Sequence, residues 1–87
     1  MEKISAQKLN EKMVMDSEGS EMGILHNTVL NAETGMLTEL VVKPASELDT
    51  SRFRKEGNYI LIPFETVKAI GDVIVVDSEK IREQIRA

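Results

Sequence analysis

The sequence contains no cysteine, which excludes a disulfide framework and any metal site built on thiolates. Aromatic residues make up only 3% of its 87 residues, which argues against the stacking platforms that bind single-stranded nucleic acids. No apolar run is long enough for a membrane-spanning helix, and the amino end has no basic region followed by a hydrophobic one. We therefore expect a cytoplasmic chain that is neither secreted nor inserted in a membrane.

Basic residues are in deficit. Fifteen acidic and eleven basic residues give a formal net charge of −4, which works against a broad phosphate-binding surface and makes nucleic acid a disfavoured partner. The densest basic cluster surrounds Phe53 and consists of Arg52, Arg54 and Lys55. It could touch RNA or an acidic protein, but we favour a solvated loop whose charges pair with neighbouring acids.

Short apolar segments separated by turn residues predict a mainly β chain. The expected strands are Met13 to Met15, Ile24 to Leu30, Leu37 to Val42, Tyr59 to Ile62 and Val73 to Val76. Short polar side chains and glycines separate the first three strands and suit tight reversals, in which Gly35 is expected to take a positive φ. Pro44 and Pro63 suit strand ends because proline cannot donate a hydrogen bond to a ladder.

The remaining segments carry weaker β signals. Residues 45–58 are polar and charged and are interpreted as a long loop with one helical turn, and helical turns are also expected at 5–12 and 64–69. Residues 78–86 are predicted to form a C-terminal helix, capped by Asp77 or Ser78. Ile81 and Ile85 of this helix are four residues apart and therefore share one face.

No group of residues has a recognisable catalytic or metal-binding pattern. His26 is the only histidine, and a metal or catalytic site would need partners that the spacing does not supply, so we interpret it as structural or neutral. The acidic turn at residues 16–21 superficially resembles a calcium loop, but it is too short and has no flanking helices. We therefore expect no enzyme activity, no cofactor and no metal.

Methionine is abundant for a chain of this size, with five residues. If Val14 points into the core, Met13 and Met15 point outward, because alternate residues of a strand share a face. Flexible, polarisable methionine side chains suit adaptable protein contacts. The competing interpretation places them in an imperfect core, since a shift of one residue reverses every face. The sequence leaves both interpretations open.

Three segments, taken in order, resemble the PRC-barrel family. They are Met13 to Gly23, Asn31 to Val42 and Ile60 to Gly71, and the resemblance spans roughly residues 9–76. It implies a single domain over residues 1–87, with a small β-barrel of about five or six strands over residues 9–76 and a short C-terminal helix. The family often has charged or polar residues at the positions of Met13, Ile24 and Met36, which implies that one outer face of this barrel has become a contact surface.

The candidate protein interface therefore consists of Met13, Met15, Ile24, Met36, Ile81 and Ile85. Standalone archaeal members of the family are implicated as adaptors at the cell-division ring. The resemblance thus implies a non-catalytic protein-binding module that acts at the division site with a SepF-like membrane anchor. Its protein partner is either that anchor or a paralogous PRC-barrel protein. It also implies a homodimer or heterodimer formed through one face of the barrel.

The family also supplies part of a ribosome-maturation factor, which implies an alternative role in binding a ribosomal protein near rRNA. The acidic charge balance and the lack of an accompanying RNA-side domain weaken that alternative. A likeness to the barrel of a photosynthetic reaction-centre subunit has less support because no membrane anchor is present. A small-molecule sensor is a further option, but no pocket-lining polar group can be identified.

Overall fold

The computed structural model describes residues 12–86, with side chains as far as Glu83. The strands are β1 (Met13–Asp16), β2 (Glu21–Leu30), β3 (Leu37–Pro44), β4 (Arg54–Glu56), β5 (Tyr59–Pro63), β6 (Val67–Ile70) and β7 (Ile74–Val76). A 3-10 helix, η1 (Phe64–Thr66), precedes β6, and an α-helix, α2 (Ser78–Arg86), follows β7. The helical turn predicted for residues 5–12 falls, apart from Lys12, outside the described residues.

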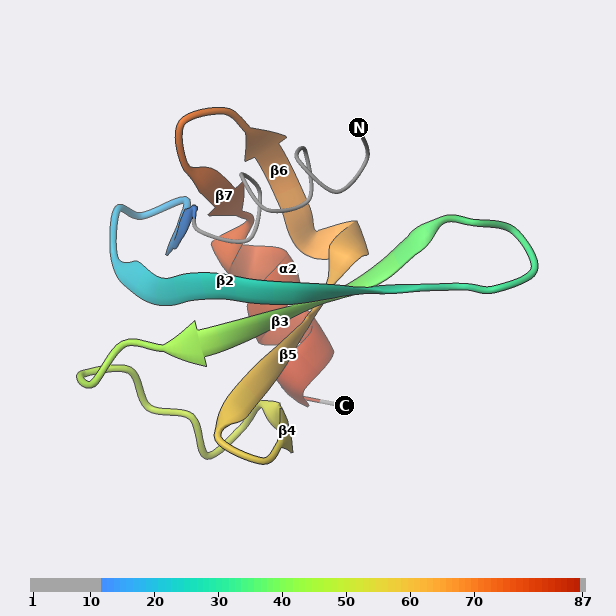
Figure 1. The fold of residues 1–87 in the computed structure, drawn as a ribbon. Helices are drawn as coiled ribbons and strands as arrows, with labels where there is room; N and C mark the ends of the chain where they lie inside the picture. Colours follow the sequence, from blue (N-terminus) through green and yellow to red (C-terminus); the bar gives the residue numbers. More distant parts are fainter. Residues whose placement is uncertain (1–11, 87) are drawn as a thin grey trace.

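All seven strands form one sheet in the order β4-β5-β3-β2-β1-β7-β6. Neighbouring strands are antiparallel except β1 and β7, which are parallel and place Val14 beside Ile74. The sheet curls, and α2 lies behind β2, β3 and β5 in the view of Figure 1. The predicted fold class, mainly β with a short C-terminal helix, is confirmed.

Strand alternation builds the core, because every second side chain of a strand points to the same side of the sheet. The aliphatic side chains with at most 1% exposure are Val14, Leu25, Leu40, Val42, Ile60, Ile62, Ile74 and Val76. Burying each of them stabilises the fold by about 1.5–3 kcal/mol. Since Val14 points inward, Met13 and Met15 belong to the opposite face, as the first of the two sequence interpretations predicts.

Short polar side chains fix the chain reversals that the sequence predicts. Asp16 Oδ1 accepts the backbone N–H groups of Glu18 at 3.0 Å and Ser20 at 2.8 Å in the turn between β1 and β2. Asp77 Oδ1 accepts two N–H groups in the first turn of α2, at 2.9 and 3.1 Å, and is therefore its cap.

In the described part of the chain, no helix is long and apolar enough to cross a membrane.

The sheet has more strands than the five or six expected, and β4 is one reason. Residues 54–56, which the sequence places in a long loop, pair with β5 across a turn in which Gly57 has a φ of 63°. All three residues of β4 are charged and exposed. They therefore lack the alternation of apolar and polar side chains that marks a half-buried strand.

β6 is the other reason. The helical turn expected over residues 64–69 ends at Thr66, and Val67–Ile70 pairs with β7 instead. The Thr66 hydroxyl donates to the Pro63 carbonyl at 2.7 Å, and the Thr66 carbonyl accepts the N–H of Asp77 at 2.8 Å. Pairing with a strand that follows later in the chain thus decides the conformation of residues 67–70.

Candidate functional site

The two longest strands, β2 and β3, form a hairpin whose base is tightly packed. Gly23 lies opposite Pro44 and has a φ of 152°. A Cβ atom at Gly23 would lie 2.1 Å from the Lys43 carbonyl oxygen, far inside van der Waals contact. Only glycine fits there, because the backbones of β2 and β3 approach each other closely at the base of the hairpin.

The outer half of this hairpin extends beyond its neighbouring strands. β1 pairs with residues 21–24 of β2, with one further hydrogen bond from the Leu25 N–H to the Lys12 carbonyl. β5 pairs only with residues 39–42 of β3. Residues 26–38, here called the hairpin arm, therefore have no other strand beside them within the described part of the chain. Figure 1 shows the arm projecting from the rest of the sheet.

The tip of the arm, residues 30–36, is exposed throughout. It carries two large apolar side chains, Leu30 with 58% and Met36 with 67% of its surface exposed. These fractions are the highest among the large hydrophobic side chains of the described residues. Exposed apolar side chains that lie close together are typical of protein contact sites.

Asn31 organises the turn at the tip. Its Oδ1 accepts the N–H groups of Glu33 at 2.8 Å and Thr34 at 3.1 Å. Its N–H donates to the Met36 carbonyl at 2.8 Å, and its carbonyl accepts the N–H of Gly35 at 2.7 Å. Gly35 has a φ of 74°, as predicted. The tip is thus ordered by hydrogen bonds within its own few residues.

The structure divides the predicted interface residues between two places. Met13 and Ile24 are cross-strand partners at the base of the hairpin, where Ile24 is 39% exposed and Met13 is half-buried. Met15, on the same strand as Met13, is also half-buried. Met36 lies at the tip, directly before the first residue of β3. The two sets therefore form a base patch and a tip patch rather than one continuous face.

The assignment of Ile81 to the interface is corrected by the structure. Ile81 is 6% exposed and packs into the core cluster, because α2 lies on the barrel of its own chain with this residue facing inward. Its side chain stabilises the fold and is not available to a partner while the helix stays docked. The side chain of Ile85 lies outside the described part of the structure.

Two exposed apolar residues were not anticipated. Leu30 ends β2, and Ile70, with 47% exposure, ends β6. Each stands directly before a turn residue, Asn31 or Gly71. An apolar residue directly before a turn residue is the sequence signal that could have identified them. Such a residue ends its strand, where fewer neighbouring residues cover its side chain.

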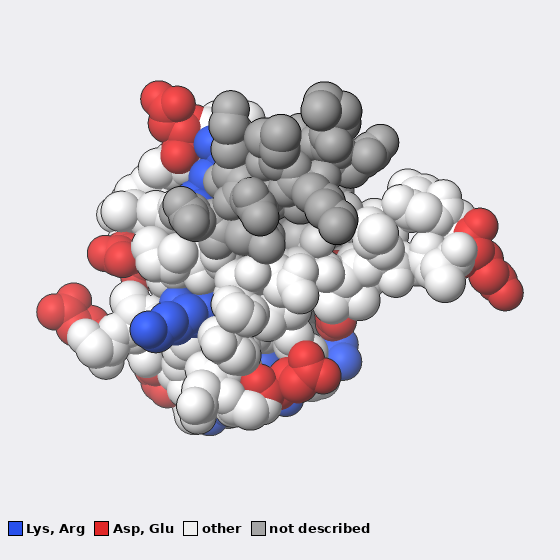
Figure 2. Space-filling view, in the orientation of Figure 1, with Lys and Arg blue, Asp and Glu red and all other residues white. Residues whose placement is uncertain are grey.

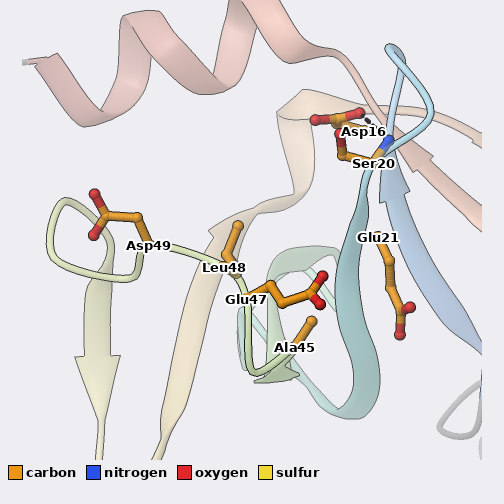
Figure 3. A pocket seen from close by; sticks show the side chains of 7 residues that line it. All are labelled: Asp16, Ser20, Glu21, Ala45, Glu47, Leu48 and Asp49. Carbon is orange, nitrogen blue, oxygen red and sulfur yellow. Dashed lines mark hydrogen bonds between the residues drawn. The ribbon is translucent and has the colours of Figure 1, made fainter.

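A shallow cleft of about 440 Å³ is lined by residues of the β1–β2 turn and of the loop after β3. Its acidic side chains are Asp16, Glu21, Glu47 and Asp49, shown in Figure 3. The N–H and hydroxyl of Ser51 donate to Asp49 and hold the pKa of its carboxyl below the ordinary value. No group of three or more acidic or histidine side chains suited to a metal ion exists among the described residues. The cleft is therefore an acidic surface feature.

His26 stacks on Tyr59, with ring centroids 4.3 Å apart and planes inclined by 10°. Their strands, β2 and β5, lie on either side of β3, so the stacked pair bridges that strand. Stacked aromatic rings contribute about 0.5–1.5 kcal/mol beyond the area that they bury. The histidine thus has a structural partner, in agreement with its interpretation from the sequence.

The basic cluster around Phe53 is divided by the fold. Arg54 forms an ion pair with Glu39 of β3, and not with the acids near it in sequence. Phe53 packs against the core. Arg52 and Lys55 remain exposed. The cluster therefore has a partly structural role, and its aromatic side chain is not presented for stacking on a base.

Comparison with known proteins identifies the family. The model of the PRC-barrel domain family matches residues 1–82 of this chain. An uncharacterized protein of the archaeon Methanocaldococcus jannaschii is 38% identical over 77 residues, which cover 88% of this chain and 84% of that protein. The seven-stranded sheet and the short C-terminal helix agree with a PRC-type barrel. The chain therefore belongs to the PRC-barrel domain family.

Proposed function

We propose that this chain is a non-catalytic adaptor that binds another protein through apolar side chains of the β2–β3 hairpin. The observation that carries this proposal is the distribution of exposed large hydrophobic residues in the described part of the chain. Three of the four, Ile24, Leu30 and Met36, belong to this one hairpin. Exposed apolar side chains concentrated on one element provide the area that an interface buries.

The setting that we propose is the archaeal cell-division ring, with the chain in the cytoplasm and a SepF-like membrane anchor or a paralogous PRC-barrel protein as its partner. Family membership and the archaeal relative support this setting, together with the resemblance to standalone archaeal members. Recruitment to the division site would follow from binding the anchor. A homodimer or heterodimer of barrels would add a second contact surface.

Ribosome maturation is the alternative, with a ribosomal protein as the partner. The feature that such a role would use is the exposed basic strand β4, which includes Lys55. The formal net charge of −4 and the absence of any Lys or Arg between Lys12 and Lys43 favour a protein partner over RNA.

The decisive experiment is a calorimetric titration of the purified chain with the SepF-like protein and with each paralogous PRC-barrel protein of the same organism. Saturable binding with a Kd of about 1 μM, which corresponds to roughly −8 kcal/mol, is the expected result. Binding to none of them would reject the division setting. A parallel capture from native extract with and without nuclease tests the alternative, because nuclease-sensitive recovery of ribosomal proteins would place ribosome maturation first.

A further inference from the structure

We propose that the tip of the hairpin arm inserts into an apolar cleft of a different protein, whose rim carries a Lys or Arg that pairs with Glu33. This inference rests on the proposed adaptor function and specifies how the adaptor recognises its partner. The other exposed apolar residues, Ile24 and Ile70, lie outside the tip and are not part of this contact.

The shape of the arm indicates what kind of surface on the partner can bind it. Leu30 and Met36 stand near the end of a projecting two-stranded ribbon, with 58% and 67% of their surfaces exposed (Figure 1). Leu30 is the cross-strand partner of Leu37, and the next pair joins Asn31 to Met36, so strand alternation places Leu30 and Met36 on opposite sides of the ribbon. A flat surface could cover only one of them. A cleft can cover both apolar side chains at once, and full burial is what gives an apolar anchor its contribution to binding.

The tip is ordered before it binds. Asn31 contributes four hydrogen bonds within the turn, as acceptor from Glu33, Thr34 and Gly35 and as donor to Met36. The N–H of Met36 also lies 3.2 Å from the hydroxyl oxygen of Thr34. Because these residues already hold one conformation, little conformational entropy is lost when a partner closes around them.

The negative charge of the arm indicates which charge the rim of the partner's cleft carries. No Lys or Arg occurs from residue 13 to residue 42, and the acids of β3 and the tip are Glu39 and Glu33. Glu39 pairs with Arg54 on the body of the sheet. Glu33 has no ion pair within the described residues and stands beside the apolar tip, where Figure 2 shows a largely uncharged arm with an acidic end. A cation on the partner would complement it.

The acidic cleft of this chain argues against a second copy as the occupant. Asp16, Glu21, Glu47 and Asp49 line that cleft, so they would repel Glu33 of another copy. A smaller hollow of about 220 Å³ contains Lys55 and Tyr59. A contact of the tip with this hollow between two copies is the competing outcome, and it would appear as self-association.

The test compares two matched variants in the titrations with the SepF-like and paralogous PRC-barrel proteins. The tip variant carries L30S and M36S, and the control carries I70S, which removes an exposed apolar side chain from another strand. We expect the tip variant to lose at least about tenfold in affinity and the control to lose less than about twofold. Thermal unfolding of both variants tests whether they remain folded.

Charge is tested separately. E33Q should weaken binding about threefold and E33K further, and both should flatten the dependence of affinity on salt, because a rim charge acts mainly through long-range attraction. Unchanged affinity in L30S/M36S would overturn the tip proposal while leaving the adaptor function intact. Absence of binding by the wild-type chain would reject the division setting and, with it, the tip contact with these partners. A wild-type dimer that L30S/M36S converts to monomer would overturn the claim that the occupant is a different protein.

Discussion

Ser17 and Ser78 are joined by two hydrogen bonds, although 61 positions separate them in the sequence. The N–H of Ser78 donates to Ser17 Oγ at 2.9 Å, and the two hydroxyl oxygens lie 3.0 Å apart. Ser78 is only 6% exposed. The turn between β1 and β2 is thereby fastened to the first residue of α2, the helix whose Ile81 fills part of the core.

Replacing Ser17 by Ala should lower the free energy of unfolding by about 1–3 kcal/mol, because the buried N–H and hydroxyl of Ser78 would lose their partner. Urea unfolding at pH 7 measures this change. The matched control is Ser46→Ala, since Ser46 is exposed in the loop after β3. Equal stability of the two variants would mean that water replaces Ser17 without cost.

Replacing Gly23 by Ala should cost more than about 3 kcal/mol or prevent folding. The new Cβ would meet the Lys43 carbonyl oxygen at 2.1 Å and Val42 Cγ1 at 2.9 Å, so the hairpin base would have to move. Gly19→Ala provides the control, because Gly19 has a φ of 92° but nothing lies within 4 Å of its Cβ position. We expect about 1 kcal/mol there, from backbone strain alone. Urea unfolding of the two variants should show this order, and a reversed order would contradict the close approach at Gly23.

The cap of α2 should make stability depend on pH. The N–H of Lys80, together with that of Glu79, stabilises the carboxylate of Asp77 and lowers its pKa below the ordinary value of 3.8. A lowered folded-state pKa means that the cap contributes fully above the unfolded-state value and that its contribution is lost as the pH falls through the folded-state value.

The corresponding experiment is urea unfolding of the wild type and Asp77→Asn between pH 2 and 6. Asparagine keeps a side-chain oxygen at the cap but does not titrate, so the variant should lose less stability than the wild type on acidification. Parallel curves for the two proteins would show that the carboxylate of Asp77 does not contribute to the acid sensitivity.

The two faces of β1 should respond differently to lysine. Val14→Lys places a charge in the core at a fully buried position and should abolish cooperative folding. Met13→Lys and Met15→Lys lie on the opposite, half-buried face, where a long side chain can carry its charge to water, so both should remain folded with a moderate loss of stability. Circular dichroism during heating distinguishes these outcomes. Unfolding of the Met13 and Met15 variants would place these side chains among the core contacts.

Much of the fold could be predicted from local chemistry. Asp16, Asn31 and Asp77 each bind backbone N–H groups a few residues ahead, and such contacts depend only on neighbouring sequence. The inward direction of Val14 followed from strand alternation and from the position of the turn. β4 and β6 were missed because their conformation depends on pairing with β5 and β7, for which their own side chains give little signal.

The candidate site was predictable only in part. Met36 and Ile24 were identified by their apolar character at positions expected to be polar, and both are exposed. Ile81 is also apolar, but it is buried. The sequence could not predict this, because periodicity identifies the apolar face of a helix but not the surface on which that face packs. Leu30 was missed because the extent of pairing by β1 and β5, which leaves the arm without a neighbouring strand, is a property of the whole sheet.

The parallel pairing of β1 with β7 determines when the two parts of the sheet can join during synthesis. β2, β3 and β5 are joined by antiparallel pairing and can assemble as soon as they leave the ribosome. Of the described strands, β1 is synthesised first and β7 last, yet the two are neighbours in the sheet. One edge of β1 therefore remains unpaired until β7 has been synthesised. A ribosome stalled before β7 would therefore hold a nascent chain in which β1 lacks its second neighbour, and emergence of β7 would supply that neighbour.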